Sequence, residues 1–187
     1  MKILAFAGMP GSGKSLASEY AKEKGIDIIR LGDITDIELN KRGLKTNEKN
    51  EKKVRESLRK EGGMAVYAKK TAERAERNGL EKVVFDGVRS YEEYLFLKEK
   101  YGEDFKVISI LVSPETRYKR LMDRKVRSLT LEECKSRDEA EIQGLNHAGT
   151  IVMGEKYIIN EGSKKEFEEK IKQTLEKFIK ATAQKSL

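Results

Sequence analysis

The chain has 187 residues but only one cysteine, one histidine, two prolines and no tryptophan. A single cysteine, Cys134, excludes an internal disulfide, and the sequence offers no clustered Cys/His set for a metal ion. No apolar run is long enough to cross a bilayer, and no stretch has the pattern of a secretory leader. These absences exclude a disulfide scaffold, a zinc-finger-like domain and a membrane span, and we expect a cytoplasmic protein.

Charged residues make up 38% of the chain, and the net charge is +7. Aromatic residues are few, but the apolar residues gather in short runs, which argues against disorder. The positive charge fits either a nucleic-acid surface or a polyanionic small substrate. Many lysines stand among glutamates at helical spacing, as at Glu166 and Lys170, which is typical of a solvated face. We therefore expect a small phosphate-bearing partner, no nucleic-acid or membrane partner, and a monomer or homodimer.

Short apolar runs alternate with segments of helical spacing along the whole chain. The runs predict strands at residues 2–7, 26–31, 82–85, 106–112 and 156–159. Helices are expected from Ser12 onward, over much of 34–80, at 91–100, and after caps at Ser113, Thr130 and Ser163. This alternation predicts one α/β domain with a parallel sheet covered by helices on both faces. In such sheets ligands bind where the strands end.

The strongest signal lies directly after the first expected strand, where residues 8–15 read Gly-Met-Pro-Gly-Ser-Gly-Lys-Ser. This is the G-x-x-x-x-G-K-S pattern of a phosphate-binding loop, or P-loop. Its glycines let main-chain N–H groups point at phosphate oxygens, and the next helix adds its positive end. Lys14 can then reach the β- and γ-phosphates, while the Ser15 hydroxyl can ligate Mg²⁺. We expect ATP and Mg²⁺ as cofactors, bound by Gly8, Pro10, Gly11, Ser12, Gly13, Lys14 and Ser15.

Two aspartates and an arginine follow expected strands. Asp86 could hold Mg²⁺ directly or through water, or it could serve only the Asp-Gly turn in which it stands. Asp33 could orient an attacking hydroxyl or accept its proton, and it could also cap the next helix, since the two roles are compatible. Arg89 could pair bidentately with a substrate phosphate, or it could be a surface residue.

Arginines are concentrated in the segment that follows the fourth expected strand. Arg117, Arg120 and Arg124 are spaced to share one helix face, Arg127 follows in the turn, and Arg137 lies on the next helix. Arginines stabilise the charge that spreads over a transferred phosphoryl group. A helix–turn–helix that carries them could close over ATP and exclude water. We expect Arg124 and Arg137, and then Arg127, to act on the phosphates, and Arg117 and Arg120 to lie on the surface.

Several segments together resemble the archaeal adenylate-kinase-related UPF0200 family, which is similar to nucleoside monophosphate kinases and dephospho-coenzyme A kinases. The P-loop is generic, whereas Asp-Gly-Val-Arg-Ser at 86–90 and Asn-Glu-Gly at 160–162 are far more specific. The resemblance runs in order over nearly the whole chain. Its segments are 8–15, 31–33, 84–90, 113–117, 136–138 and 157–163.

The resemblance implies a P-loop NTPase fold of three αβα layers around a five-stranded parallel sheet. The core would comprise residues 1–33, 81–119 and 146–187, with an acceptor-binding helical insertion at 34–80 and a lid at 120–145. The loop from Asn160 through Ser163, with Gly162 within it, would lie against the adenine. By the same resemblance, Asp33 and Arg89 face the acceptor, and Arg124 and Arg137 face the ATP phosphates.

Two segments depart from the resemblance. Ile34-Thr35-Asp36-Ile37 stands where adenylate kinases carry an arginine after the Gly-Asp pair, which argues against AMP as the acceptor. Residues 143–149 have no assigned role, and we expect His147 to be structural because nothing nearby in the sequence forms a dyad with it.

The sequence therefore predicts an ATP-dependent phosphotransferase that acts on dephospho-coenzyme A or a nucleoside monophosphate. Asp33 as a proton acceptor suits a hydroxyl acceptor slightly better, because a nucleotide phosphate is already ionised. The alternative is a nucleotide-regulated ATPase or RNA-associated binding module with slow turnover. The positive charge allows this alternative, but the sequence carries no aromatic-rich RNA-binding signature.

Overall fold

A computed structural model describes residues 1–125 and 128–183, so Arg127 lies outside the described residues. The strands are β1 (Lys2–Ala7), β2 (Asp27–Arg30), β3 (Lys82–Asp86), β4 (Phe105–Leu111) and β5 (Lys156–Ile159). They form one sheet in the order β2-β3-β1-β4-β5, and every neighbouring pair is parallel. The five-stranded parallel sheet is thus confirmed, with strand ends within a residue or two of those predicted.

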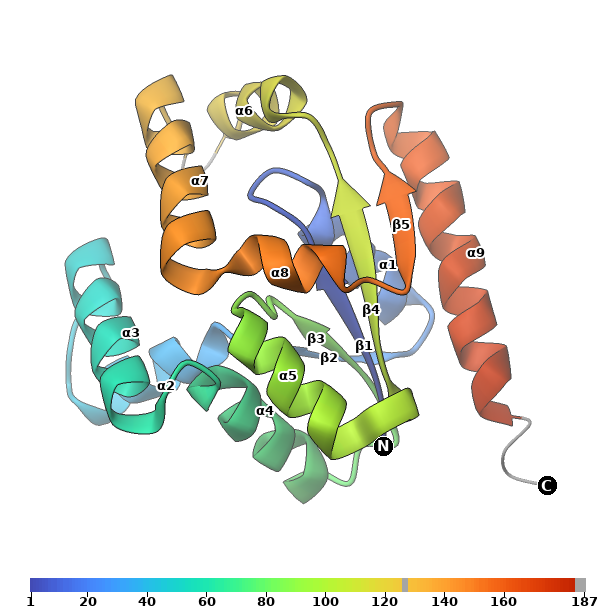
Figure 1. Ribbon diagram of the computed structural model, residues 1–187, viewed down its shortest axis with the longest axis horizontal. Coiled ribbons are helices and arrows are strands. Elements are labelled where there is room, and N and C mark those ends of the chain that lie inside the picture. The colour runs from blue at the N-terminus through green and yellow to red at the C-terminus, as the bar shows by residue number, and fades with distance from the viewer. Residues whose placement is uncertain (126–127, 184–187) are drawn as a thin grey trace.

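Helices cover both faces of this sheet (Figure 1). They are α1 (Lys14–Glu23), α2 (Asp33–Lys41), α3 (Glu48–Gly62), α4 (Val66–Arg77), α5 (Tyr91–Tyr101), α6 (Pro114–Met122), α7 (Leu131–Leu145), α8 (His147–Val152) and α9 (Lys164–Ala183), with a short 3₁₀ turn at Gly102–Asp104. The predicted three-layer arrangement is confirmed.

Alternation along the strands divides the core in two. In β1, Ile3 and Ala5 pack with the helices of residues 34–101, whereas Leu4 and Phe6 pack with α1 and α9. Side chains on successive strand residues point to opposite faces, so a strand buried on both faces is a continuous apolar run. All four of these side chains are at most 1% exposed. The core therefore places β1, and the loop that follows it, at the centre of the molecule.

The predicted helix caps are present. Ser113 accepts from the main chain of Thr116, and Thr130 and Glu133 form a reciprocal capping box. Ser163 and Glu166 exchange the same pair of hydrogen bonds at 3.2 Å each. The suggested cap at Asp33 is wrong: Gly32 occupies the cap position and Asp33 is the first helical residue. Its carboxylate faces Arg74 and Arg30 instead.

The segment that sequence patterns left without a role contains a sharp turn between two helices. Asn146 separates α7 from α8 and has a left-handed conformation with φ of 47°, which asparagine tolerates better than most residues. His147 then opens α8, which packs on α5 and β4. Within the described ranges, no helix combines the length and apolar character that a membrane crossing requires.

Candidate active site at the P-loop

The loop after β1 has room only for glycine at three of its positions, and at the first of them a Cβ on Gly8 would lie 2.6 Å from the main-chain oxygen of Ile110. Gly11 and Gly13 have φ of +83° and +107°, a region that side chains rarely adopt. A Cβ on Gly13 would lie 2.7 Å from Nδ2 of Asn160, and one on Gly11 would lie 2.8 Å from the main-chain oxygen of Arg117. These close contacts explain why α1 begins at Lys14 rather than at Ser12 as predicted: the preceding residues form a packed loop.

Neighbouring elements hold this loop from two sides. Nδ2 of Asn160 donates to the main-chain oxygen of Ser12 at 2.8 Å, and Nη1 of Arg117 donates to that of Pro10 at 3.1 Å. Gly8 follows β1 directly, and Ser15 in the first turn of α1 is exposed. The loop is thus a fixed cradle whose Ser15 hydroxyl remains accessible to a ligand.

Lys14 folds back onto its own loop, where Nζ donates to the carbonyl oxygens of Gly8 and Met9. Burial and the nearby charge of Arg89 lower the pKa of Lys14 to about 8, although Glu141 and Asp86 oppose that shift. These influences mean that Arg89, Glu141 and Asp86 all lie close to the ammonium group. An anion bound in the cradle could take the place of these two carbonyl oxygens as the hydrogen-bond partner of the Lys14 ammonium group.

Two aspartates lie at the carboxyl edge of the sheet. Asp86 ends β3 half-buried, and burial raises the pKa of its carboxyl group while Lys14 and Arg30 oppose the rise. Asp33 opens α2 with Nη1 of Arg74 at 3.6 Å and Nη1 of Arg30 at 4.0 Å. The fold therefore brings Asp33, Asp86 and Lys14 to one edge, as parallel strands require.

Arg89 is held at three points. Its main-chain N–H donates to Oε2 of Glu93 at 2.7 Å, and its carbonyl oxygen accepts from the Thr150 hydroxyl at 3.0 Å. Nη1 of its guanidinium lies 3.2 Å from Oε1 of Glu141. The side chain is nevertheless 48% exposed, so the guanidinium still faces solvent beside the P-loop.

The expectation that Arg117 and Arg120 are surface residues is wrong. Arg117 is 4% exposed and binds Asp138 through two hydrogen bonds of 2.9 and 2.6 Å. Arg120 donates to the main-chain oxygen of Asn160 at 2.9 Å. Helical spacing placed Arg117 and Arg120 on one face but does not say whether that face packs inward. Here it does, with Arg117 on the P-loop and Arg120 on the loop after β5.

Arg124 and Arg137 are not brought to the P-loop. Both are exposed, and among the described residues no hydrogen bond or ion pair joins either one to residues 8–15. For Arg124 the reason is local, because α6 ends at Met122 and the shared helix face does not extend to it. A role on the phosphates would require the segment that carries these two arginines to move.

The loop after β5 joins the ends of two strands. The Glu161 carboxylate accepts from the main-chain N–H of Ser113 and, at 2.6 Å, from the Thr116 hydroxyl. Asn160 is 6% exposed, and Gly162 follows in the turn before α9. This loop therefore fixes the end of β5 to the start of α6, next to the P-loop.

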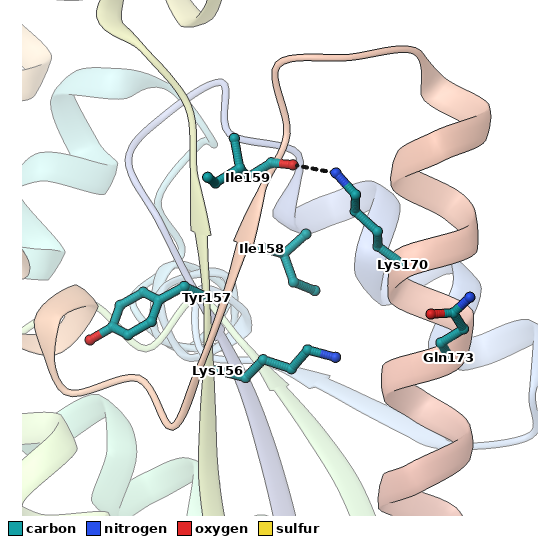
Figure 2. A pocket seen from close by; sticks show the side chains of 6 residues that line it. All are labelled: Lys156, Tyr157, Ile158, Ile159, Lys170 and Gln173. Carbon is teal, nitrogen blue, oxygen red and sulfur yellow. Dashed lines mark hydrogen bonds between the residues drawn. The ribbon is translucent and has the colours of Figure 1, made fainter.

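Figure 2 shows a shallow groove between β5 and α9, with a volume of about 250 Å³. Its lining is Lys156, Tyr157, Ile158, Ile159, Lys170 and Gln173. Nζ of Lys170 crosses it to the carbonyl oxygen of Ile159 at 3.1 Å. The groove shares no residue with the P-loop and contains no carboxylate, so we place the candidate site at the P-loop.

Glu93 predicts a pH effect on stability. Burial raises the pKa of its carboxyl group to about 7, although the N–H groups of Arg89 and Ser90 oppose the rise. The folded state then binds the Glu93 proton more tightly than the unfolded state does. The contribution of this proton to the free energy of unfolding is complete below pH 4.5 and is lost as the pH rises to about 7. Glutamine at position 93 still accepts hydrogen bonds but does not titrate. We therefore expect Glu93→Gln to remove up to about 3 kcal/mol of the pH dependence of the free energy of unfolding.

Urea unfolding at pH 5 and 7.5 measures the effect, with Glu92→Gln as the control because Glu92 is exposed on the same helix turn. Equal pH dependence in Glu93→Gln and the wild type would contradict the assigned pKa shift.

Sequence reasoning missed several residues around the site: Glu93, Arg117, Asp138, Glu141 and Thr150. Ser90 and Glu93 have the spacing of a capping box, and that signal could have located Glu93. The other four residues follow no short-range pattern: Arg117 and Asp138 pair with each other, Thr150 pairs with Arg89 far away in the sequence, and Glu141 meets His147 only through the turn at Asn146.

Comparisons with known proteins agree with the fold and with the presence of a P-loop. The model of the AAA_18 family, described as an AAA domain, matches residues 4–144. A UPF0200 protein of Methanosarcina mazei is 40% identical over 79% of this chain and 74% of its own length. One of Methanosarcina acetivorans is 35% identical over 99% of this chain and 100% of its own length.

Solved structures with similar folds are small-molecule kinases. A shikimate kinase from Bacteroides thetaiotaomicron superposes with a TM-score of 0.64 at 14% identity, over 94% of this chain and 97% of that one. A gluconokinase from Sinorhizobium meliloti superposes with a TM-score of 0.60 at 16% identity, over 100% and 98%. At these identities the likeness shows the fold, a parallel sheet between two layers of helices.

Proposed function

We propose that this chain, which belongs to the UPF0200 family, is a kinase that transfers the γ-phosphate of ATP to a small nucleotide-like acceptor. The observation that carries the proposal is the convergence of Lys14, Asp86, Asp33 and Arg89 around the P-loop at one edge of the sheet. A P-loop binds triphosphates, and the charged groups beside it are the types that phosphoryl transfer uses.

The donor side of the site is assigned to the P-loop. Main-chain N–H groups of the P-loop residues other than Pro10, which has none, would bind the phosphate oxygens, and Lys14 would exchange its two carbonyl contacts for the β- and γ-phosphates. Ser15 and Asp86 would hold Mg²⁺, whose charge neutralises the phosphates when it is bound. One hydroxyl and one carboxylate are enough because Mg²⁺ retains waters and substrate oxygens as its other ligands.

The acceptor side is assigned to Asp33 and Arg89. Arg89 would bind an anionic group of the acceptor through guanidinium N–H groups that face solvent. Asp33 would orient the acceptor hydroxyl or take its proton, which favours dephospho-coenzyme A over a nucleoside monophosphate. We assign residues 34–80 to acceptor binding and 120–145 to a lid, which would rotate about the retained contacts of Asp138 and Glu141 and so bring Arg124 and Arg137 toward ATP on closing.

A coupled assay with purified protein, ATP and Mg²⁺ tests the proposal. The acceptor panel contains dephospho-coenzyme A, AMP and the other nucleoside monophosphates, with shikimate and gluconate included because the structural neighbours are kinases for these compounds by name. Transfer to a nucleotide-like acceptor supports the proposal. Acceptor-independent ATP hydrolysis alone, or no turnover with any compound, would favour a nucleotide-regulated binding module instead.

Asp33→Asn separates the two acceptor types. For a hydroxyl acceptor we expect a loss of about 10²-fold in kcat, because the amide cannot take the proton. For a phosphate acceptor, which is already ionised, kcat should change less than about tenfold. Asp36→Asn, an exposed site on the same helix, is the matched control. An unchanged kcat for dephospho-coenzyme A would remove the proton-acceptor role of Asp33.

A further inference from the structure

Glu141 and His147 form a buried pair beside the P-loop. Nδ1 of His147 lies 2.5 Å from Oε2 of Glu141, and the two residues are 0% and 6% exposed. The left-handed turn at Asn146 folds α8 back against the end of α7 and brings the two side chains together. Figure 1 shows α8 crossing in front of the sheet from the lower end of α7. The sequence predicted no dyad partner for His147, and that expectation is wrong, because the fold supplies Glu141.

The protonation states follow from the surroundings. Burial lowers the pKa of His147 below 6.5, although the hydrogen bond to Glu141 opposes this. Burial alone would raise the pKa of Glu141, but His147, Arg89 and Lys14 outweigh it and lower the pKa to about 2. At neutral pH a neutral imidazole therefore faces a carboxylate and must donate from Nδ1. Nε2 then carries the lone pair, and it has no hydrogen-bond partner in the described part of the chain.

The second oxygen of the Glu141 carboxylate contacts Arg89. Oε1 lies 3.2 Å from Nη1 of the guanidinium, whereas the contacts from Glu93 and Thr150 hold only the Arg89 main chain. The Glu141 contact uses one nitrogen, which leaves the other N–H donors of a half-exposed guanidinium for an anion. Glu141 therefore sets the direction of the arginine without covering it.

The same helix also reaches the P-loop. Asp138 lies three residues before Glu141, so the two share one face of α7. Asp138 binds Arg117, and Arg117 donates to the carbonyl of Pro10. One helix face is thus linked to the P-loop through Arg117, and it directly contacts the arginine that we assign to the acceptor.

We propose that Glu141 and His147 are positioning residues for Arg89: His147 fixes the Glu141 carboxylate, and Glu141 aims the Arg89 guanidinium at an anionic group of the acceptor. This inference rests on the proposed function. Neither residue touches the reacting atoms, and both act through Arg89. A purely structural role, in which the pair only joins α7 to α8, would affect folding stability and leave acceptor binding unchanged.

The first test needs no activity. Because His147 is the only histidine, the untagged protein labelled with ¹⁵N-histidine gives the signals of a single imidazole. We expect a neutral ring protonated on Nδ1 and bare on Nε2 between pH 7 and 8. A ring that carries its proton on Nε2, or one that is already half protonated at pH 6.5, would overturn the pair as described.

The second test uses the Nη1–H signal of Arg89 in ¹⁵N-arginine protein, because Nη1 is the atom that faces Oε1 of Glu141, and the signal is assigned by its loss in Arg89→Lys. In Glu141→Gln the signal should lose its exchange protection, whereas in Glu139→Gln, an exposed control on α7, it should not change. Unchanged protection in Glu141→Gln would overturn the proposal. Since this readout needs no substrate, it is independent of whether a kinase activity is found.

The third test is a double-mutant cycle with the acceptor identified by the panel. Glu141→Gln should raise the acceptor KM about tenfold and leave the KM for ATP within twofold. In an Arg89→Ala background the same change should have no further effect. His147→Asn, which retains a donor near the position of Nδ1, should recover most of what His147→Ala loses. Equal effects of Glu141→Gln with and without Arg89 would overturn a role through Arg89.

Discussion

Lys14→Ala is expected to lower phosphoryl transfer by about 10³-fold or more and to leave the fold intact. Phosphoryl transfer depends on positioning and on charge stabilisation, and Lys14 is the cation inside the P-loop. The folded protein needs this ammonium group little, because its contacts are two carbonyls of the loop and its burial carries a desolvation cost. The melting temperature should therefore be unchanged or slightly higher.

Titration calorimetry with ATP and Mg²⁺ and the coupled assay measure the two effects. Lys22→Ala, an exposed lysine on the same helix, removes the same charge outside the loop and is the control. We expect nucleotide binding to require the protonated Lys14 amine, whose pKa in the protein without nucleotide is about 8. The wild-type affinity should therefore fall as the pH rises above 8, by at most tenfold per pH unit. Full turnover by Lys14→Ala would contradict the assigned role.

Arg117→Ala is expected to destabilise the protein by about 3–5 kcal/mol. The substitution leaves the Asp138 carboxylate buried without its bidentate partner, and it also frees the carbonyl of Pro10. For a chain of this size the loss corresponds to a fall in melting temperature of roughly 6–20 °C. Thermal unfolding followed by circular dichroism measures it.

Two further variants separate charge from geometry. Arg117→Lys retains the charge but loses the two parallel hydrogen bonds, so an intermediate loss is expected. Adding Asp138→Asn to Arg117→Ala removes the unpaired charge and should restore part of the stability. A melting temperature of Arg117→Ala within about 2 °C of the wild type would show that the ion pair is not a stabilising tie between α6 and α7.

The parts of the fold that were predictable depend on local signals. A strand buried on both faces is an apolar run, and a helix start is a short pattern such as Thr130 with Glu133, so both are visible in a few residues. The P-loop is likewise a contiguous motif. Because parallel strands end at one edge, the convergence of Asp33 and Asp86 followed from the order of elements alone.

The rest of the site depends on contacts between distant residues. Arg117 and Asp138 are 21 residues apart, and nothing in the sequence distinguishes this buried arginine from the exposed Arg124. The Glu141 and His147 pair depends on one left-handed residue, Asn146, whose conformation is set by the helices that it joins. Helical spacing predicted that Arg124 shares one helix face with Arg117 and Arg120. This was wrong, because α6 ends at Met122, two residues before Arg124.

The position of β1 between β3 and β4 has a consequence for motion. Amide groups of β1 donate alternately to β3 and to β4, and helices cover both faces of the sheet there, so these amides should exchange with deuterium only on global unfolding. The edge strand β2 is paired on one side only and can open by smaller fluctuations. The P-loop therefore follows the strand whose amides should exchange most slowly. Any closure over a substrate would then have to come from movement of the peripheral helices.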